Sequence, residues 1–295
     1  MKSLQFIFQI FSAVFFLMIS SSLLAESARD IMIKVDKISK ESYTSAVQKM
    51  KLSTCKYSVA QKQMRCAENP RIKVIESVQK DTGVDNKDSR SIAIILEPVS
   101  DKGIGMLTYD YDAPGKDSDT WLYLSALGKV KRMIASSEES DESGSFFGTE
   151  FSIEDMESQK IDDYTYKILE EGTYAKQPVW IIESVPTPER ARKTRYGKTI
   201  SWIDKERFII LKANLYNRYG KLYKQLIMRD VEEIDNVWVS RKVTMNNLST
   251  RRVTNMELLS VAFNMEVPDE FLTQRTLTDF AFRERNLNEL RTYIK

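Results

Sequence analysis

The chain has 295 residues, of which 42% are hydrophobic and 29% are charged. This composition is typical of a globular protein and excludes a disordered chain or a membrane protein with many spans. The 44 basic and 42 acidic residues leave a net charge of +2, so the overall charge does not indicate nucleic-acid binding. There is no histidine, which excludes serine–histidine and cysteine–histidine catalysis and histidine metal sites. We predict neither a cofactor nor a metal.

The N-terminal segment has the pattern of a secretory signal peptide. Lys2 provides a positive charge, a long apolar run follows, and Ala25 is a small residue at a plausible cleavage position. We predict that residues 1–25 are removed on export and that residues 26–295 form the mature chain. The apolar run is long enough that an uncleaved membrane anchor is the alternative, although two glutamines within it disfavour a span.

Two cysteines, Cys55 and Cys66, are the only ones in the chain. A lone pair of cysteines in an exported protein usually forms a disulfide, which would clip the residues between them into a small loop or hairpin. The alternative is a pair of free thiols in a reducing compartment.

The remaining chain reads as one helix, a long series of strands and a final helix. Residues 28–40 are predicted to be helical because Ile31, Val35 and Ile38 follow i, i+4, i+7 spacing. Residues 279–295 read as a polar amphipathic helix. Between the two, alternating or short apolar runs predict strands at 43–53, 71–80, 91–97, 105–111, 120–124, 129–135, 164–170, 178–185, 198–203, 208–216, 222–231, 237–245 and 252–263.

Turn signals separate many of these strands, so the pattern predicts a mainly β, antiparallel meander. A meander of about a dozen strands does not stay flat, and it curls, splits into a sandwich or closes into a barrel. No linker divides the chain, which favours a single domain.

Two blocks carry a resemblance to a known family. They are WLYLSALGKVKRMIASS (121–137) and GSFFGTEFSIEDM (144–156), and they resemble the LolA-like outer-membrane lipoprotein-sorting protein family. Its members carry a W-x-Y-L-P-x-L…R-R-I block and a motif close to F-M-G-S-D-F-x-Y-E-D. Ser125 replaces the usual proline, Phe147 the methionine and Glu150 the aspartate. The residues that match are Trp121, Tyr123, Leu124, Leu127, Arg132, Phe146, Gly148, Phe151, Glu154 and Asp155.

Two further stretches, KGIGMLTYDYD (102–112) and VPDEFLTQRTL (267–277), are similar to other blocks of the family, so the resemblance covers roughly residues 43–278. It implies a curved, incomplete antiparallel β-barrel with helices across its open side. It also implies a periplasmic carrier that binds lipid or lipoprotein acyl chains in an apolar concave cavity and moves them toward the outer membrane. An inner-membrane transporter and an outer-membrane acceptor are the implied partners. An accessory protein of an inner-membrane exporter of other hydrophobic compounds is the alternative.

Nine residues are candidates for ligand binding, mostly because they are large and apolar and lie in or near these blocks. Aromatic residues at strand parity are more often ordinary core residues, so packing alone is the alternative for each of them. The candidates are Trp121, Tyr123, Leu124, Arg132, Phe146, Phe147, Phe151, Trp180 and Trp202.

Arg132 raises a separate question, because strand alternation places it on the same face as Val130. A buried guanidinium without a partner is very costly. We therefore predict that it forms an ion pair that holds the Phe146–Phe147 loop against the sheet, with a cargo headgroup as the alternative anion. The candidate carboxylates follow in the next block: Glu150, Glu154 and Asp155.

These three carboxylates also suggest paired acid–base catalysis, as in glycoside hydrolysis. No second acidic element stands out as a catalytic partner, and acids favour the first turn of a short helix, so we predict no enzymatic activity. A basic connection, with Arg190, Arg192, Lys193, Arg195 and Lys198, is predicted to be exposed. Its charge suits anionic headgroups or an acidic partner, and a merely soluble loop is the alternative.

Overall fold

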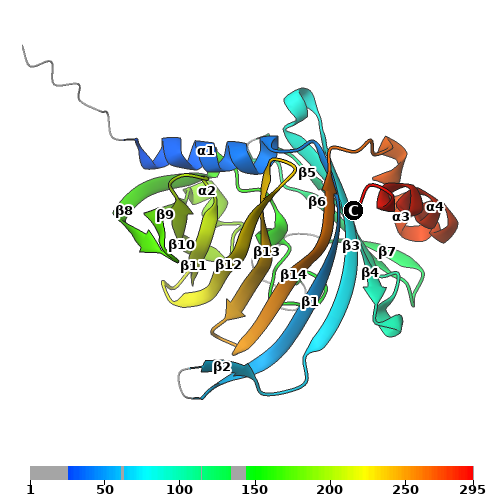
Figure 1. Cartoon of the computed structure of the whole chain (residues 1–295), viewed down its shortest axis with the longest axis horizontal. Coiled ribbons are helices and arrows are strands. Elements are labelled where there is room, and N and C mark those ends of the chain that lie inside the picture. Colours follow the sequence, from blue (N-terminus) through cyan, green and yellow to red (C-terminus); the bar gives the residue numbers. More distant parts are fainter. Residues whose placement is uncertain (1–25, 61–62, 114, 134–143, 295) are drawn as a thin grey trace, which may run out of the picture.

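A computed structural model of the chain describes residues 26–60, 63–113, 115–133 and 144–294 (Figure 1). The predicted signal peptide and most of the acidic loop before Phe146 lie outside these ranges. The helices are α1 (Ala28–Glu41), α2 (Pro188–Ala191), α3 (Gln274–Thr278) and α4 (Phe280–Arg291). Short 3₁₀ turns occur at η1 (Val84–Asn86), η2 (Val99–Asp101), η3 (Glu154–Met156), η4 (Ile161–Asp163) and η5 (Asp269–Phe271).

Within the described ranges, fourteen strands form one antiparallel sheet. They are β1 (Ser45–Ala60), β2 (Gln63–Cys66), β3 (Arg71–Thr82), β4 (Asp88–Glu97), β5 (Gly105–Asp110), β6 (Asp119–Leu124), β7 (Lys129–Met133), β8 (Tyr164–Tyr174), β9 (Gln177–Pro186), β10 (Tyr196–Asp204), β11 (Ile210–Asn217), β12 (Leu222–Ile234), β13 (Val237–Asn247) and β14 (Arg252–Phe263). Their order is β7-β6-β5-β4-β3-β1-β14-β13-β12-β11-β10-β9-β8, and β2 pairs only with β1.

The first and last strands, β1 and β14, lie side by side in the middle of the sheet, so chain closure holds its two halves together. The sheet curves strongly, and β7 and β8 remain its two edges (Figure 1). This confirms the predicted mainly β fold, a curved antiparallel barrel that stays incomplete, with a few covering helices.

Helix α1 lies across the sheet at the ends of several strands (Figure 1). Ser27 caps it by accepting a hydrogen bond from the backbone N–H of Asp30 at 3.2 Å. Its buried side chains, including Ile31 and Val35, pack on Ile182 and Ile203 of the sheet. The 3.6-residue apolar period therefore predicts both the helix and its buried face. None of the helices in the described ranges is long and apolar enough to cross a membrane.

The two faces of the β1–β6 half of the sheet have separate cores. On the outer face, η5, α3 and α4 cover Val78 and Leu107 through Phe271, Leu277 and other apolar side chains. On the inner face, a second cluster includes Met50, Ala93 and Met106. Because neighbouring residues of a strand point to opposite faces, one continuous apolar run supplies both cores.

The two cysteines are joined, which confirms the predicted disulfide: Cys55 and Cys66 have their Cα atoms 5.7 Å apart. The bond links β1 to β2 in a hairpin that continues β1 beyond the body of the sheet (Figure 1). Strand β2 was not among the predicted strands, because its residues lack a clear apolar alternation.

Candidate ligand cavity

A cavity of about 470 Å³ lies between α1 and the inner face of the sheet. Helix α1 contributes Val35 and Ile38, and the sheet contributes side chains from its central strands and from β11–β13. Ile38 and Trp238 line the cavity and are 37% exposed, so they stand where it opens to solvent. The volume falls in the range of ordinary small-molecule pockets.

Methionine is the most distinctive residue of the cavity wall. Five of the chain's twelve methionines line it: Met50, Met106, Met156, Met228 and Met256. Methionine is unbranched and polarizable, and it adapts to irregular apolar ligands. Small or polar side chains, such as Ser77, Ser91 and Gln48, are spaced between them. The wall is therefore mainly apolar and adaptable.

A second cavity, of about 280 Å³, adjoins the first. Ile153, Glu157 and Ile210 line both, so these residues form the partition between them. The second cavity is rich in charged side chains, among them Asp110 and Arg190. The inner face thus offers an apolar compartment next to a charged one.

The segment from Gly144 to Ser158 crosses the inner face and separates the two cavities. Its three aromatic residues, Phe146, Phe147 and Phe151, are all buried in the inner-face cluster. The backbone N–H of Phe146 donates to the carbonyl of Phe151 at 2.8 Å, which closes a tight turn. Phe147 and Gly148 both have positive φ within it, and glycine adopts that conformation without strain. Phe146 and Phe147 therefore anchor this segment in the inner-face core.

Glu150 is the first of three carboxylates that fix this segment to the sheet. It accepts from Arg252 Nε at 2.8 Å and from the side-chain amide of Asn247 at 2.9 Å. Asn247 is the last residue of β13 and Arg252 is the first residue of β14, so both flank the turn between these strands. The Glu150 backbone N–H also donates to Thr254 at 3.0 Å.

Asp155 is the second carboxylate, and it is the most deeply buried ion-pair member of the segment. Lys224 Nζ lies 3.2 Å from Asp155 Oδ2, and their side chains are 4% and 5% exposed. Tyr196 donates its hydroxyl to Oδ1 at 2.6 Å, and the Ser152 backbone N–H donates to Oδ2 at 2.7 Å. Burial and the neighbouring Asp155 charge raise the pKa of Tyr196 well above its usual value, so it stays a hydrogen-bond donor.

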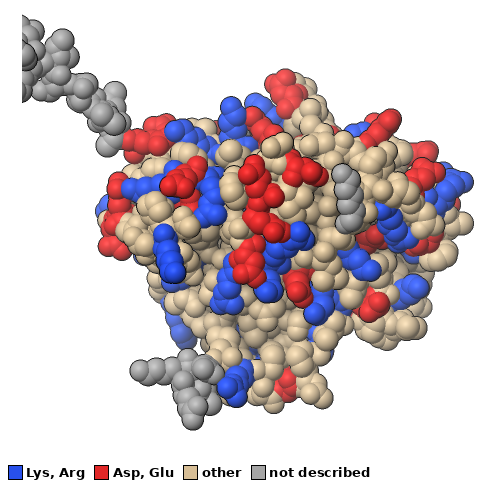
Figure 2. Space-filling model, in the orientation of Figure 1, with Lys and Arg blue, Asp and Glu red and all other residues tan. Residues whose placement is uncertain are grey.

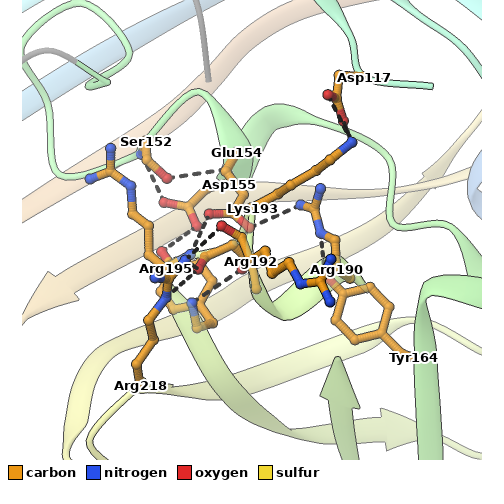
Figure 3. Close-up of polar contacts among 12 residues, drawn as sticks. Asp117, Ser152, Glu154, Asp155, Tyr164, Arg190, Arg192, Lys193, Arg195 and Arg218 are labelled. Atoms are coloured by element: carbon orange, nitrogen blue, oxygen red, sulfur yellow. Dashed lines mark hydrogen bonds and ion pairs between the residues drawn. The ribbon is translucent and has the colours of Figure 1, made fainter. Parts of the chain in front are cut away.

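Glu154 is the third carboxylate, and Figure 3 shows it facing the arginines of the α2–β10 connection. Arg190 Nη2 donates to Glu154 Oε1 at 2.9 Å, and the Arg195 backbone N–H donates to Oε2 at 3.3 Å. Arg190 Nε also reaches the Tyr164 hydroxyl at 3.3 Å. The basic connection was predicted to be exposed, but Arg190 and the Arg195 backbone N–H bind Glu154 within the protein.

The prediction that Arg132 pairs with Glu154 or Asp155 is wrong. Arg132 shares its face with Val130, as alternation requires, but β7 is an edge strand, so its side chain is 64% exposed. It pairs with Asp119 on the adjacent strand β6. The carboxylates do hold the Phe146–Phe147 segment, but their cationic partners are Arg252, Arg190 and Lys224, far along the sequence.

The structure places the nine candidate ligand-binding residues at several sites. Phe146 lines the apolar cavity. Phe147 and Phe151 pack in the same inner-face cluster as Phe146, but they line neither cavity. The other six line neither cavity: Trp121 and Tyr123 pack in the outer-face core, Trp180 packs near α1, Trp202 lies on the outer face beside Lys212, Leu124 ends β6, and Arg132 pairs with Asp119.

Contact of these nine residues with a ligand stays a prediction. Apart from Phe146, the residues that line the apolar cavity are different ones. Sequence reasoning missed the methionines and the exposed Ile38 and Trp238. Met50, Met106 and Met256 do follow strand alternation with polar or outer-facing neighbours. That signal identifies a face of a strand, but it does not show which face becomes concave.

Glu157, in the partition, has its pKa raised to about 7 by burial and by the nearby Asp110 charge. Glu154 adds to the rise, whereas Arg190 and a hydrogen bond with Ser118 oppose it. A carboxyl with a raised pKa binds its proton more tightly in the folded chain. The stability it contributes is therefore present below pH 4.5 and is lost as the pH rises through about 7.

Glu157→Gln is therefore expected to remove this pH dependence. The variant should be as stable as the parent at pH 5 and more stable at pH 8, by about 2 kcal/mol after allowance for solvent screening. Urea unfolding at both pH values measures the difference. A variant whose advantage does not grow between pH 5 and pH 8 would show that Glu157 has an ordinary pKa.

Comparison with known proteins finds a matching family model and solved structures with a similar fold. A family model described as "Uncharacterized protein" matches residues 87–279, well over half of the chain. None of the curated proteins matches.

Three solved structures share the fold. A DUF1329 family protein from Desulfovibrio piger has a TM-score of 0.74 at 20% identity, with 85% of this chain and 97% of that chain covered. A putative outer membrane lipoprotein-sorting protein domain from Vibrio parahaemolyticus has a TM-score of 0.71 at 23% identity, with 85% and 98% covered. A LolA superfamily protein from Nitrosomonas europaea has a TM-score of 0.58 at 18% identity, with 84% and 97% covered.

Together with the motif blocks, these matches confirm the resemblance drawn from the sequence. The chain belongs to the family that the matching model describes, and it has the fold of the LolA superfamily protein.

Proposed function

We propose that this protein is a periplasmic carrier that shelters an acyl chain of a lipid or lipoprotein in the cavity between α1 and the sheet. The observation that carries the proposal is the apolar, methionine-lined cavity of about 470 Å³ that opens beside Ile38 and Trp238. Burial of an acyl chain stabilises the complex by about 0.8 kcal/mol per methylene, so a dry cavity is what transit through water requires.

Three further features support this assignment. The N-terminal segment has the pattern of an export signal, and the Cys55–Cys66 disulfide suits an oxidising compartment. One protein with this fold is described as a putative outer membrane lipoprotein-sorting protein domain. The carboxylates of the crossing segment are engaged by Arg252, Arg190 and Lys224, which suits a structural rather than a catalytic role. We propose that residues 26–295 act as one domain and exchange cargo with an inner-membrane transporter and an outer-membrane acceptor.

A cavity-filling variant tests the carrier function. Ser91 lines the cavity, so Ser91→Trp should occupy it while adding no charge. We expect the protein purified from the periplasm to carry lipid detectable by native mass spectrometry. The variant should retain less than a tenth of that lipid.

Thr173→Trp is the matched control, because Thr173 is exposed on the edge strand β8 and lines neither cavity. It should carry as much lipid as the parent. Equal lipid content in the Ser91→Trp variant, with unchanged thermal unfolding, would show that the lipid binds elsewhere. An absence of lipid from the parent protein would favour an exporter accessory role.

A further inference from the structure

The end of the sheet that carries the β1–β2 hairpin is chemically unlike the rest of the molecule. We define a basic rim as residues 56–60, 63–72, 218–221 and 248–251. It comprises the hairpin with the start of β3, the β11–β12 turn and the β13–β14 turn. Within these residues there are six basic side chains and one acidic side chain, whereas the whole chain is nearly balanced. The rim therefore concentrates positive charge.

Hydrogen bonds show that these segments lie together. The Tyr57 backbone N–H donates to the carbonyl of Arg251 at 2.9 Å, which joins the hairpin to the β13–β14 turn. The Leu248 backbone N–H donates to the carbonyl of Tyr223 at 2.9 Å, which joins that turn to the start of β12. The β11–β12 turn immediately precedes that strand. The rim is thus one continuous edge.

Four of the six basic side chains of this edge show no carboxylate partner in the part of the chain that the structure describes. Within the described ranges, no ion pair involves Lys56, Arg71, Lys221 or Arg251, and all four are exposed. Among the described residues, Arg218 donates to the backbone carbonyls of Thr194 and Arg192. The one acid, Glu68, accepts from the Lys56 backbone N–H at 2.9 Å and lies 3.7 Å from Arg252. The positive charge is therefore open to an external anion.

Large apolar side chains project from the same edge. Val59 and Met64 are directly opposite each other in the hairpin and are 66% and 45% exposed. Ile72 is 49% exposed and Tyr219, in the β11–β12 turn, is 95% exposed. None of these residues lines either cavity. In Figure 2 the acidic side chains of the visible face gather over its upper part, and few lie toward the β2 end.

We propose that the basic rim docks the protein on the surface of an anionic phospholipid bilayer. Lysine and arginine side chains beside such a surface each strengthen binding about five-fold, and exposed apolar tips insert at the headgroup boundary. Tyrosine favours the same interface, because its ring is apolar and its hydroxyl remains hydrated. The disulfide between Cys55 and Cys66 ties strand β2 to strand β1 at the rim. This docking goes beyond the carrier function and does not require it.

Co-sedimentation with vesicles tests the proposal. The parent protein should sediment with vesicles that contain phosphatidylglycerol, should not sediment with vesicles of phosphatidylcholine alone, and should be released by high salt. Lys221→Gln with Arg251→Gln should weaken binding about 25-fold. Val59→Ser with Met64→Ser should weaken binding while preserving its salt dependence.

Lys129→Gln with Lys176→Gln is the matched control, because both lysines are exposed and lie outside the rim. This variant has the same net charge as the first and should bind as the parent does. Failure of the parent to sediment, or equal weakening by the control, would overturn the proposal. Rim-dependent binding of polyglutamate without vesicle binding would assign the rim to an acidic protein partner and would also overturn it.

Discussion

Lys224→Met is expected to lower the free energy of unfolding by about 3–5 kcal/mol, because it leaves the buried Asp155 carboxylate without its counter-charge. Both side chains are almost completely buried, at 4% and 5% exposure, and their charged atoms are 3.2 Å apart. Tyr196 and the Ser152 backbone still hydrogen-bond to Asp155, but neither carries a positive charge. Urea unfolding followed by tryptophan fluorescence measures the loss.

Two further variants make this result specific. Lys242→Met removes an ion pair with Asp230 on the surface, where the side chains are 53% and 55% exposed, and it should lower the free energy of unfolding far less than Lys224→Met does. The double variant Lys224→Met with Asp155→Asn should recover part of the stability, since the remaining amide is neutral. If Lys224→Met is no more destabilising than Lys242→Met, Asp155 does not need Lys224 as its counter-charge.

Phe151→Ala is expected to have an effect of similar size, about 3–5 kcal/mol, through the void left by a buried aromatic ring. Phe151 is 3% exposed and packs with Phe146 and Met245 in the inner-face cluster. Because Phe146 forms part of the cavity wall, loss of its support should also weaken lipid retention. Thermal unfolding and the lipid content of the purified protein measure the two effects.

Phe280→Ala is the control for this variant, since Phe280 is 59% exposed on α4. It should change the free energy of unfolding by about 1 kcal/mol or less and leave the lipid content unchanged. A Phe151→Ala protein as stable as the Phe280→Ala protein would mean that the packing of the Gly144–Ser158 segment does not depend on the Phe151 ring.

The fold could be predicted largely from local patterns. Alternation in stretches such as residues 71–80 and 252–263 predicts strands that the structure confirms, and the i, i+4, i+7 spacing of Ile31, Val35 and Ile38 predicts α1. The exception is β2, which the disulfide and its pairing with β1 hold in place. Its sequence alone does not favour a strand.

The site was harder to predict because it depends on tertiary arrangement. Alternation correctly groups Trp121 with Tyr123, yet that face is covered by α3 and α4, and the opposite face becomes concave. Arg132 is correctly grouped with Val130, but the position of β7 at the sheet edge leaves it exposed. The partners of Glu150 and Asp155 are about 102 and 69 residues away, beyond the reach of local patterns.

A crystal structure with a brominated fatty acid tests the central claim most directly, because anomalous scattering locates the bromine atoms independently of the protein. The carrier function predicts bromine between α1 and the inner face, beside Met106 and Met228. Bromine on the outer face, near Trp121 under α3 and α4, or the absence of any ordered bromine from that cavity, would contradict it.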